Sequence, residues 1–216
     1  MKPTYAIGVV AHVSRANQAH ALMDQAGAAY MSLDNGNLGC GGNHRKVWRH
    51  LDKHHARNAY WLLTLEDDAI IPDGFQEQLD RVLAVTPAPI VSFYLGRLRP
   101  PHLQYMIEPA TKRADDRDAS WIVSRQLLHA VGLAIRSDLV KDMLSSLDEE
   151  LPIDDAINVW ANKHRYRIGY TWPSLVDHAD GETLLQHPDG HQREPGRVAW
   201  RSGTRDTWTH QLVEMN

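Results

Sequence analysis

Short apolar runs alternate with amphipathic segments along most of this chain. Each apolar run has the length of a β-strand, and the segments between them repeat apolar residues at the spacing of a helix face. The predicted strands cover residues 6–11, 27–33, 61–65, 90–95, 119–123, 130–135 and 167–171. The predicted helices cover about 17–26, 43–51, 75–83, 137–144 and 154–160. This alternation predicts an α/β fold, in which ligands bind at the carboxyl ends of the strands.

Two stretches lack this regularity. Residues 96–118 show no clear period, and we interpret them as a long loop over the ligand-binding face. The tail from Gly181 is rich in His, Arg, Gly and Pro, and it is predicted to form loops with a short strand near 198–200. Its basic character comes from Arg193, Arg197, Arg201 and Arg205. We therefore expect a main α/β domain over 1–180 and a loop-rich extension over 181–216 that packs on it.

Three consecutive carboxylates, Glu66, Asp67 and Asp68, follow the apolar run 61–65. In an extended backbone Glu66 and Asp68 would project to one side and Asp67 to the other. Neighbouring carboxylates repel each other, and burial increases the cost unless a cation neutralises them. Carboxylate oxygens suit Mg²⁺ or Mn²⁺, which also bind substrate phosphates. The motif indicates a divalent metal site, while acids that face water or cap the next turn are the alternative.

The ends of the first two predicted strands carry further polar candidates. His12, Ser14 and Arg15 follow the first strand, where an anionic ligand would meet a helix N-terminus and a guanidinium. A solvated surface Arg15 is the simpler interpretation. Asp34 ends the second strand, where it would accept hydrogen bonds from a ribose or a base, or stabilise the turn that follows.

A glycine-rich segment, Leu38–Gly42, precedes the helix predicted from Asn43, which we expect to cap it. The lysine and hydroxyl residue of a phosphate-binding loop are absent. Close approach of the backbone to a ligand or to a neighbouring strand explains the glycines instead. Cys40 is interpreted as structural, because a lone cysteine beside glycines is more often structural than nucleophilic.

Asp154 and Asp155 open the last predicted helix. Acids in a first turn interact favourably with the helix dipole, so capping alone accounts for them. Alternatively, one of them is a general base held at the edge of a cleft by the helix start.

Length and composition limit the class of protein. At 216 residues the chain fits one domain with a sizeable core. No stretch has the apolar length of a membrane span, and the first residues do not lead into a signal-peptide pattern, so we expect a cytoplasmic protein. The single cysteine excludes an internal disulfide framework. A formal net charge of -4 argues against general affinity for polyanions, although a local basic face remains compatible with it.

The order of these pieces resembles glycosyltransferases of the GT-A type, in which a Rossmann-like domain with a mixed central sheet carries an acidic motif after a central strand. More narrowly, Leu38–Trp48 followed by Leu63–Ala69 resembles the opening of the family 25 transferases, which include lipooligosaccharide and procollagen galactosyltransferases. This chain has Asn43 and His44 where that family usually has Ser-His. Gly132–Ser137 and Pro152–Asp155 resemble later motifs of the family.

Other pieces are similar to small glycosyltransferases encoded by phages of actinobacteria, which makes the host cytoplasm the expected location. These pieces are His12–Arg15, Leu95–Arg97, Arg99–His102 and Thr171–His178. The resemblance spans nearly the whole chain and implies that residues 1–180 form the GT-A catalytic domain.

The resemblance also implies roles for individual residues. Asp68, assisted by Glu66 or Asp67, would hold Mn²⁺ or Mg²⁺ against the diphosphate of a nucleotide-sugar donor, most often a UDP-sugar, and His178 would complete the metal site. Arg15 would face the donor phosphates, with His12 and Ser14 beside it. Asp34 would meet the base or ribose, and His44 would position the donor or the acidic motif. For an inverting transfer, Asp154, or as second choice Asp155, would be the base that deprotonates the acceptor hydroxyl.

The acceptor stays open between a hydroxylated DNA base, Ser or Thr of a virion protein, and a saccharide. The net negative charge disfavours DNA, whereas the arginine-rich tail and the 96–101 segment favour it. Two other classes compete with a transferase. A non-catalytic nucleotide-sugar or carbohydrate-binding module would bind a donor without turnover. A metal-dependent phosphohydrolase or nuclease would need more converging acids and histidines than the pattern supplies.

Overall fold

The structure is a computed structural model of the 216-residue chain, and it describes residues 2–180 and 196–216. Arg193, one of the arginines expected to make the tail basic, lies outside these ranges. Eight strands form the main sheet: β1 (Tyr5–His12), β2 (Tyr30–Asp34), β3 (Trp61–Glu66), β5 (Ile90–Ser92), β6 (Trp121–Ser124), β7 (Gly132–Arg136), β8 (Ile168–Thr171) and β10 (Leu212–Glu214). Two shorter strands, β4 (Ala69–Ile70) and β9 (Asp177–His178), pair with each other beside it.

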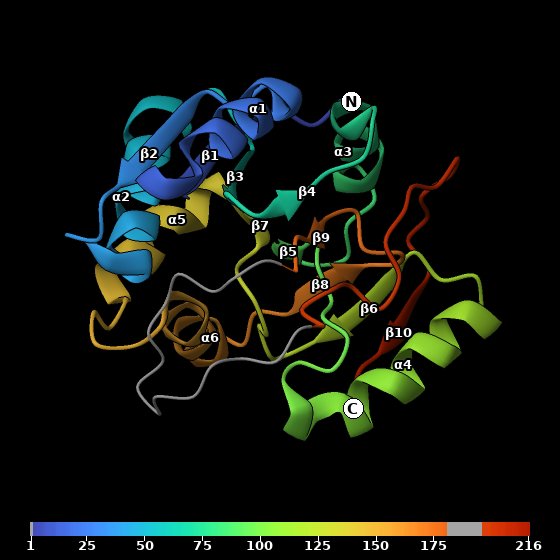
Figure 1. Ribbon diagram of the computed structural model, residues 1–216. Coiled ribbons are helices and arrows are strands. Elements are labelled where there is room, and N and C mark those ends of the chain that lie inside the picture. The colour runs from blue at the N-terminus through green and yellow to red at the C-terminus, as the bar shows by residue number, and fades with distance from the viewer. Residues whose placement is uncertain (1, 181–195) are drawn as a thin grey trace.

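The main sheet is mixed. Its strand order is β10-β6-β8-β5-β7-β3-β1-β2. The strands β2, β1 and β3 run parallel to one another, whereas β7 runs antiparallel to both of its neighbours, β3 and β5. With helices on both faces, this arrangement confirms the predicted fold class, a mixed central sheet flanked by helices as in a Rossmann-like GT-A domain (Figure 1).

Six α-helices flank the sheet in the described part of the chain. They are α1 (Ala16–Ala26), α2 (Gly39–His55), α3 (Phe75–Leu83), α4 (Gln104–Asp116), α5 (Ser137–Ser146) and α6 (Ile153–Lys163), and two short 3-10 turns cover Val13–Arg15 and Pro101–Leu103. The buried side chains of α1 and α3 belong to one core layer. Those of α2, α4, α5 and α6 belong to the other (Figure 1).

Alternating side chains of the central strands build the two layers. In β1, Ala6 and Val10 join the layer under α2, while Ile7 and Val9 join the layer under α1. This alternation follows from the pleat, which turns successive side chains to opposite faces. Gly8 lies between them, and a Cβ placed there would come within 2.4 Å of Val47 Cγ1 of α2. The missing side chain therefore allows α2 to pack closely on β1.

Two local predictions about helices were wrong. Asn43 does not begin α2, because the helix starts at Gly39, where a φ of +65° suits glycine and not a bulkier residue. The segment 96–118 is not a long irregular loop, since it contains α4 with a proline inside it. The apolar residues of that helix, Ile107, Ala110 and Ala114, recur at helical spacing but are small and few.

The C-terminal segment also differs from its prediction. No strand forms at 198–200, where Ala199 makes only an isolated bridge to Gly96. The strand of the tail is β10, which extends the main sheet through β6, and Trp208 is buried against the core. The domain boundary at residue 180 stays a prediction.

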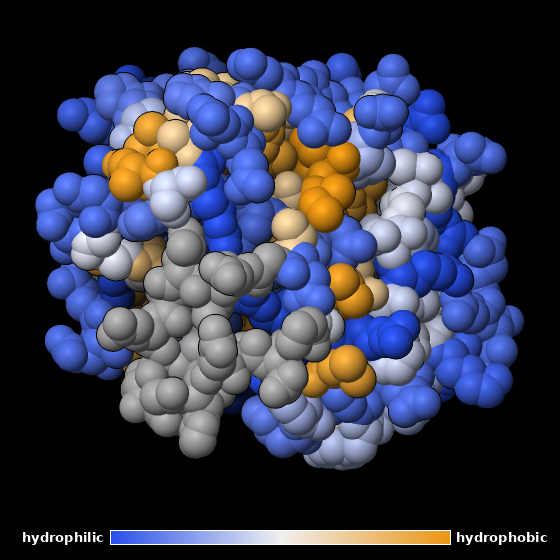
Figure 2. Space-filling view, in the orientation of Figure 1, coloured by the Kyte–Doolittle hydropathy of each residue, from blue (hydrophilic) through white to orange (hydrophobic). Residues whose placement is uncertain are grey.

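The surface shows no single dominant apolar region on the face in Figure 2, where separate hydrophobic patches lie among hydrophilic side chains. Among the helices of the described residues, none combines the length and hydrophobicity that crossing a membrane requires.

Candidate functional site

The ends of three parallel strands place the predicted polar residues at one edge of the sheet. His12 at the end of β1 is paired with Asp34 at the end of β2, and Val10 is paired with Glu66 at the end of β3. A cleft of about 310 Å³ lies at this edge. Its lining consists of Val10, Ala11, His12, Arg15, Asp34, Gly36, Gly39, Cys40, Asn43, Glu66, Asp67, Asp68, His178 and Arg197. The topology thus brings together most of the side chains that the sequence singled out.

Asp67 and Asp68 lie in a turn, because β3 ends at Glu66. The expected alternation, with Asp67 pointing away from Asp68, was wrong for this reason. Arg15 Nη1 donates to Asp67 Oδ1 at 2.9 Å and to Asp68 Oδ2 at 2.7 Å. Both carboxylates therefore face the same guanidinium.

Asp67 fastens the turn to the end of β1. Its Oδ2 accepts a hydrogen bond from the backbone N–H of His12 at 2.8 Å, while its Oδ1 accepts from Arg15. With both oxygens engaged and the side chain only 9% exposed, Asp67 is suited to hold the geometry of the motif.

Asp68 is the acid of the motif that keeps an oxygen for a ligand. Its Oδ1 is buried and has no hydrogen-bond partner among the described residues. Burial raises the pKa of this carboxyl, and the nearby charge of Glu66 adds to the increase, although His178 and Arg15 oppose it. The neighbouring positive groups therefore do not fully compensate the negative charge of ionised Asp68.

His178 lies beside Asp68, as the resemblance implied. Its Nε2 is 3.4 Å from Asp68 Oδ2, and the short ladder in which Ala69 pairs with His178 holds it there. The imidazole is 7% exposed, and its Nδ1 has no hydrogen-bond partner within the described ranges. Asp68 Oδ1 and His178 Nδ1 are therefore two buried ligand atoms of this cleft without a hydrogen-bond partner among the described residues.

Glu66 is hydrogen-bonded to His44, a buried residue of α2. The Nε2 of His44, which is fully buried in α2, lies 2.9 Å from Oε1 of Glu66. Burial opposes the charge on Glu66, but the hydrogen bond and charge of His44 outweigh it and lower the pKa of the carboxyl. Burial likewise opposes the charge on His44, yet Cys40 and Glu66 raise its pKa to about 10. His44 itself does not line the cleft, so it acts on the acidic motif from within the protein.

Arg15 is paired with two acids, whereas the simpler interpretation had it as a solvated surface charge. Its side chain is 17% exposed, so it is not a solvated surface charge. Burial disfavours its charge, but hydrogen bonds and charges from Asp67 and Asp68 outweigh this and raise the pKa of the guanidinium. Arg15 lines the cleft, where it compensates the two acids directly.

The remaining donor-site candidates make local contacts. Oδ2 of Asp34 accepts from Gly36 N–H at 3.0 Å and Oδ1 from Leu38 N–H at 3.1 Å, so this acid stabilises the turn into α2. His12 caps the 3-10 turn by accepting from Ser14 N–H through Nδ1. Ser14 Oγ bonds the same imidazole nitrogen at 2.8 Å, and this serine is not among the residues that line the cleft.

Asp154 and Asp155 start α6 and do not line the cleft. Asp155 is exposed, whereas Asp154 is half-buried. Burial raises the pKa of Asp154 to about 6, with smaller contributions from the charges of Asp155 and Glu66. A carboxylate with this pKa fits a general base at neutral pH better than its exposed neighbour does.

Several residues of the site were missed. The Nδ2 of Asn43 donates to the carbonyls of Ala11 and Ser32, which fastens α2 to two strands beside the cleft. The sequence indicated Asn43 only as a helix cap, and because α2 starts at Gly39 this residue lies inside the helix. Arg197 reaches the cleft from the tail. Its sequence neighbourhood lacks periodicity, so no pattern predicted where it would lie.

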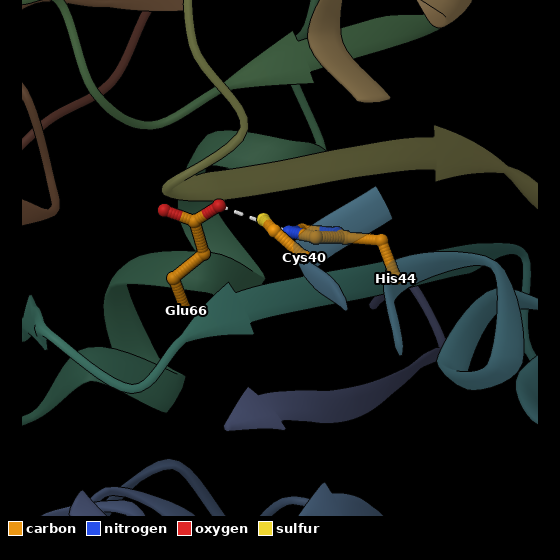
Figure 3. A group of neighbouring side chains, drawn as sticks. All are labelled: Cys40, His44 and Glu66. Atoms are coloured by element: carbon orange, nitrogen blue, oxygen red, sulfur yellow. Dashed lines mark hydrogen bonds and ion pairs between the residues drawn. The ribbon is translucent and has the colours of Figure 1, made fainter. Parts of the chain in front are cut away.

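Cys40 was also underestimated. It lies in the first turn of α2 and lines the cleft, and its Sγ, a ring nitrogen of His44 and a carboxylate oxygen of Glu66 all lie within 4.8 Å of one another (Figure 3). The spacing of Cys40 and His44, one helical turn apart, was a usable signal once the helix was known to begin at Gly39.

The fold and the cleft define a mixed α/β protein with an acidic ligand-binding site at the carboxyl ends of parallel strands. No protein-family model matches the chain, and no curated protein matches it either. A solved structure with a similar course of the chain is A197 from STIV, at a TM-score of 0.45 and 13% sequence identity over 98% of this chain and 100% of that chain. This likeness is too distant to assign a family or an activity.

Proposed function

We propose that this protein is a metal-dependent glycosyltransferase that moves a sugar from a nucleotide-diphospho-sugar to a hydroxyl acceptor with inversion. The observation that carries the proposal is the meeting of Asp68, His178 and Arg15 in one cleft at the carboxyl ends of β1, β2 and β3. A buried acid with an open oxygen, a histidine and a guanidinium together suit a diphosphate that arrives with a divalent cation.

The donor site is built from two kinds of group. Asp68 and His178 would hold Mn²⁺ or Mg²⁺, with Glu66 close by, and the bound ion would neutralise charge on the departing diphosphate. When a cation compensates the charge of the two acids, Arg15 would donate some of its hydrogen bonds to the donor phosphates and fewer to Asp67 and Asp68. Asp67 keeps the turn in place through the His12 backbone N–H.

The reaction would be a single displacement. The oxygen of the acceptor hydroxyl attacks the anomeric carbon of the sugar, the bond from that carbon to the diphosphate oxygen breaks, and the nucleoside diphosphate leaves with the electron pair. The hydroxyl proton passes to the carboxylate of Asp154. The raised pKa of Asp154, about 6, supports this residue over Asp155 as the base.

The donor and acceptor are proposed at the level of class. A UDP-sugar is the donor that the family resemblance favours. A hydroxylated DNA base, a protein Ser or Thr, and a saccharide all supply the required hydroxyl. Asp34 is occupied by the turn before α2, so a ribose or base would meet the backbone of this turn and not a free carboxylate.

A binding module without catalysis is the second candidate, and the separation of Asp154 from the cleft lining favours it. A phosphohydrolase with two metal ions is supported less, because Asp68 is the only carboxylate in the described part of the cleft with a buried, unpartnered oxygen.

The test is a thermal-shift screen of the full chain against UDP-, GDP-, TDP- and ADP-sugars, with Mn²⁺, Mg²⁺ or chelator. A ligand that binds only the native state raises the melting temperature. We expect a metal-dependent shift from one nucleotide family, followed by release of that nucleoside diphosphate when acceptor pools are added. Binding without release would select the binding module, and release of a nucleoside monophosphate together with sugar 1-phosphate would select the phosphohydrolase.

A further inference from the structure

Cys40 and His44, which the proposed transfer reaction does not use, form a cluster with Glu66 at the cleft. Cys40 and His44 lie on adjacent turns of α2, and Glu66 ends β3 (Figure 3). Within the described ranges, their ligand atoms lie within 4.8 Å of one another. Cys40 and Glu66 also line the cleft, so the cluster is open to solutes on one side.

The chemistry of the three groups fits a soft or borderline cation. A thiolate and an imidazole prefer Zn²⁺ and related ions over Mg²⁺ or Mn²⁺, which favour oxygen ligands. Bond lengths of about 2.3 Å to sulfur and about 2.0–2.2 Å to nitrogen and oxygen place tetrahedral ligand atoms roughly 3.3–3.8 Å apart. The 2.9 Å between His44 Nε2 and Glu66 Oε1, and the 4.8 Å limit for the cluster, bracket this separation.

Cys40 is the second residue of α2, so a metal-bound thiolate would lie at the positive end of the helix dipole. The Cys40 and Glu66 side chains are half-buried, whereas His44 is fixed by complete burial. A rigid imidazole flanked by two partly exposed ligands suits capture of a cation from the cleft side.

The same three residue types also occur in nucleophilic relays, but the contacts differ from a relay. A relay places the thiol on one ring nitrogen and the carboxylate on the other. Here Glu66 bonds Nε2, while Nδ1 has no hydrogen-bond partner within the described residues. Convergence of all three ligand atoms on one point suits a metal better than proton transfer through the ring.

We infer that Cys40, His44 and Glu66 form a site for a zinc-type divalent cation, with three protein ligands and a fourth position facing the cleft. Three protein ligands and one open position are the arrangement of catalytic rather than structural zinc sites. The inference does not depend on glycosyl transfer, and Cys40 and His44 belong to neither the metal pair nor the base proposed for that reaction.

Cobalt spectroscopy on the full chain tests the site directly. The protein would be freed of metal with a chelator and titrated with Co²⁺. Because Cys40 is the only cysteine in the sequence, any thiolate-to-cobalt charge-transfer band reports this residue alone. We expect that band at one equivalent of Co²⁺, together with the intense visible bands of four-coordinate cobalt, and we expect Zn²⁺ to displace both.

Two variants separate this site from the proposed donor metal site. Cys40→Ser should abolish the charge-transfer band and weaken Zn²⁺ binding by at least roughly tenfold, since losing even an outer-shell partner has that effect. Asp68→Asn should leave the band unchanged. A Co²⁺ spectrum without the charge-transfer band, or one that Asp68→Asn removes, overturns the inference.

Alkylation of the unmodified protein gives a second measurement that needs no variant. We expect iodoacetamide to modify Cys40 in chelator and Zn²⁺ to slow that reaction by at least roughly tenfold, because a coordinated thiolate is a poorer nucleophile. Equal rates with and without Zn²⁺ would identify Cys40 as a reactive thiol that binds no metal, which also overturns the inference.

Discussion

Nε2 of His178 lies 3.4 Å from Oδ2 of Asp68, although the two residues come from distant parts of the chain. The ladder between β4 and β9 creates this neighbourhood, because it pairs Ala69 with His178 immediately after the acidic motif. The proposed donor metal site thus depends on a short sheet that joins a central turn to the segment after β8.

Asp68→Asn should abolish transfer while leaving the fold intact. The substitution removes the only acid of the motif with an unpartnered buried oxygen among the described residues, and we expect a loss of at least about 10²-fold, as for other groups that stabilise transition-state charge. Because burial raises the pKa of Asp68, the ionised acid costs stability at neutral pH, so the melting temperature in chelator should not fall.

The measurement is product formation and thermal shift with and without Mn²⁺. Asp73→Asn is the matched control, since Asp73 is an exposed acid in the following turn. Normal turnover by Asp68→Asn would remove the acidic motif from the mechanism.

His178→Gln should weaken the metal site without removing it. Loss of one ligand or its partner typically reduces metal affinity by about 10–100-fold, so the Mn²⁺ concentration for half-maximal activity should rise by that factor. Activity at saturating Mn²⁺ should largely recover, because Asp68 remains. His210→Gln replaces an exposed histidine and serves as the control. An unchanged Mn²⁺ dependence would show that His178 is only a buried structural partner of Asp68.

The pH dependence should report Asp154. A general base works only when deprotonated, so the transfer rate should be level above the pKa of about 6 and fall as the pH decreases through it, by about tenfold per pH unit well below. Asp154→Asn should lower the rate by about 10²–10⁴-fold, whereas Asp155→Asn at the exposed neighbour should change it little.

Stability gives an independent readout of the same residue. The folded pKa of Asp154 lies above its ordinary value, so the protonated form is favoured in the fold and stability is lost as the pH rises from about 4 to about 6. Asp154→Asn should therefore raise the melting temperature at pH 7 relative to the wild type more than at pH 4. If the transfer rate of Asp154→Asn had the same pH dependence as that of the wild type, Asp154 would be excluded as the base.

Arg15→Gln should destabilise the metal-free protein. Arg15 Nη1 contacts both Asp67 and Asp68, and its removal leaves two largely buried carboxylates without this compensation, at a cost of about 1–3 kcal/mol. A bound cation supplies charge at the same acids, so the deficit in melting temperature should shrink when Mn²⁺ is added. Arg57→Gln, at an exposed arginine, is the control. A deficit that Mn²⁺ does not reduce would show that the ion binds elsewhere.

The sequence predicted the sheet and the acidic cleft because both depend on local patterns. Apolar runs marked the strands, and the rule that ligands bind at strand ends placed His12, Asp34 and Glu66 at one edge. The pattern left Asp34 open between a ligand and the turn that follows, and in the fold both of its oxygens accept from that turn.

The start of α2 and the helix α4 were missed for different physical reasons. Glycines disfavour a helix interior, so the run 38–42 was interpreted as a loop, although Gly39 begins the helix through a positive φ. In α4, Pro109 lies inside the helix and its buried face is made mainly of small residues, which weakens the periodic signal. Tertiary packing against β6 and β10 stabilises this helix more than its own propensity does.

Gly8→Ala should destabilise the whole domain, because a Cβ at this position meets Val47 Cγ1 at 2.4 Å and Leu51 Cδ1 at 3.3 Å. Either α2 or β1 must shift, and overpacking of this kind costs about 1–3 kcal/mol. Gly41→Ala is the contrasting variant on α2, since its Cβ meets only the side-chain end of Arg45, at 3.0 Å and not at 2.4 Å, and alanine favours the helix by up to about 1 kcal/mol. Urea unfolding should therefore move the two midpoints in opposite directions. A Gly8→Ala midpoint equal to that of the wild type would mean that α2 does not pack on β1 as closely as the structure has it. The contact between His44 of α2 and Glu66 of β3 depends on the same packing, so it would then be in doubt as well.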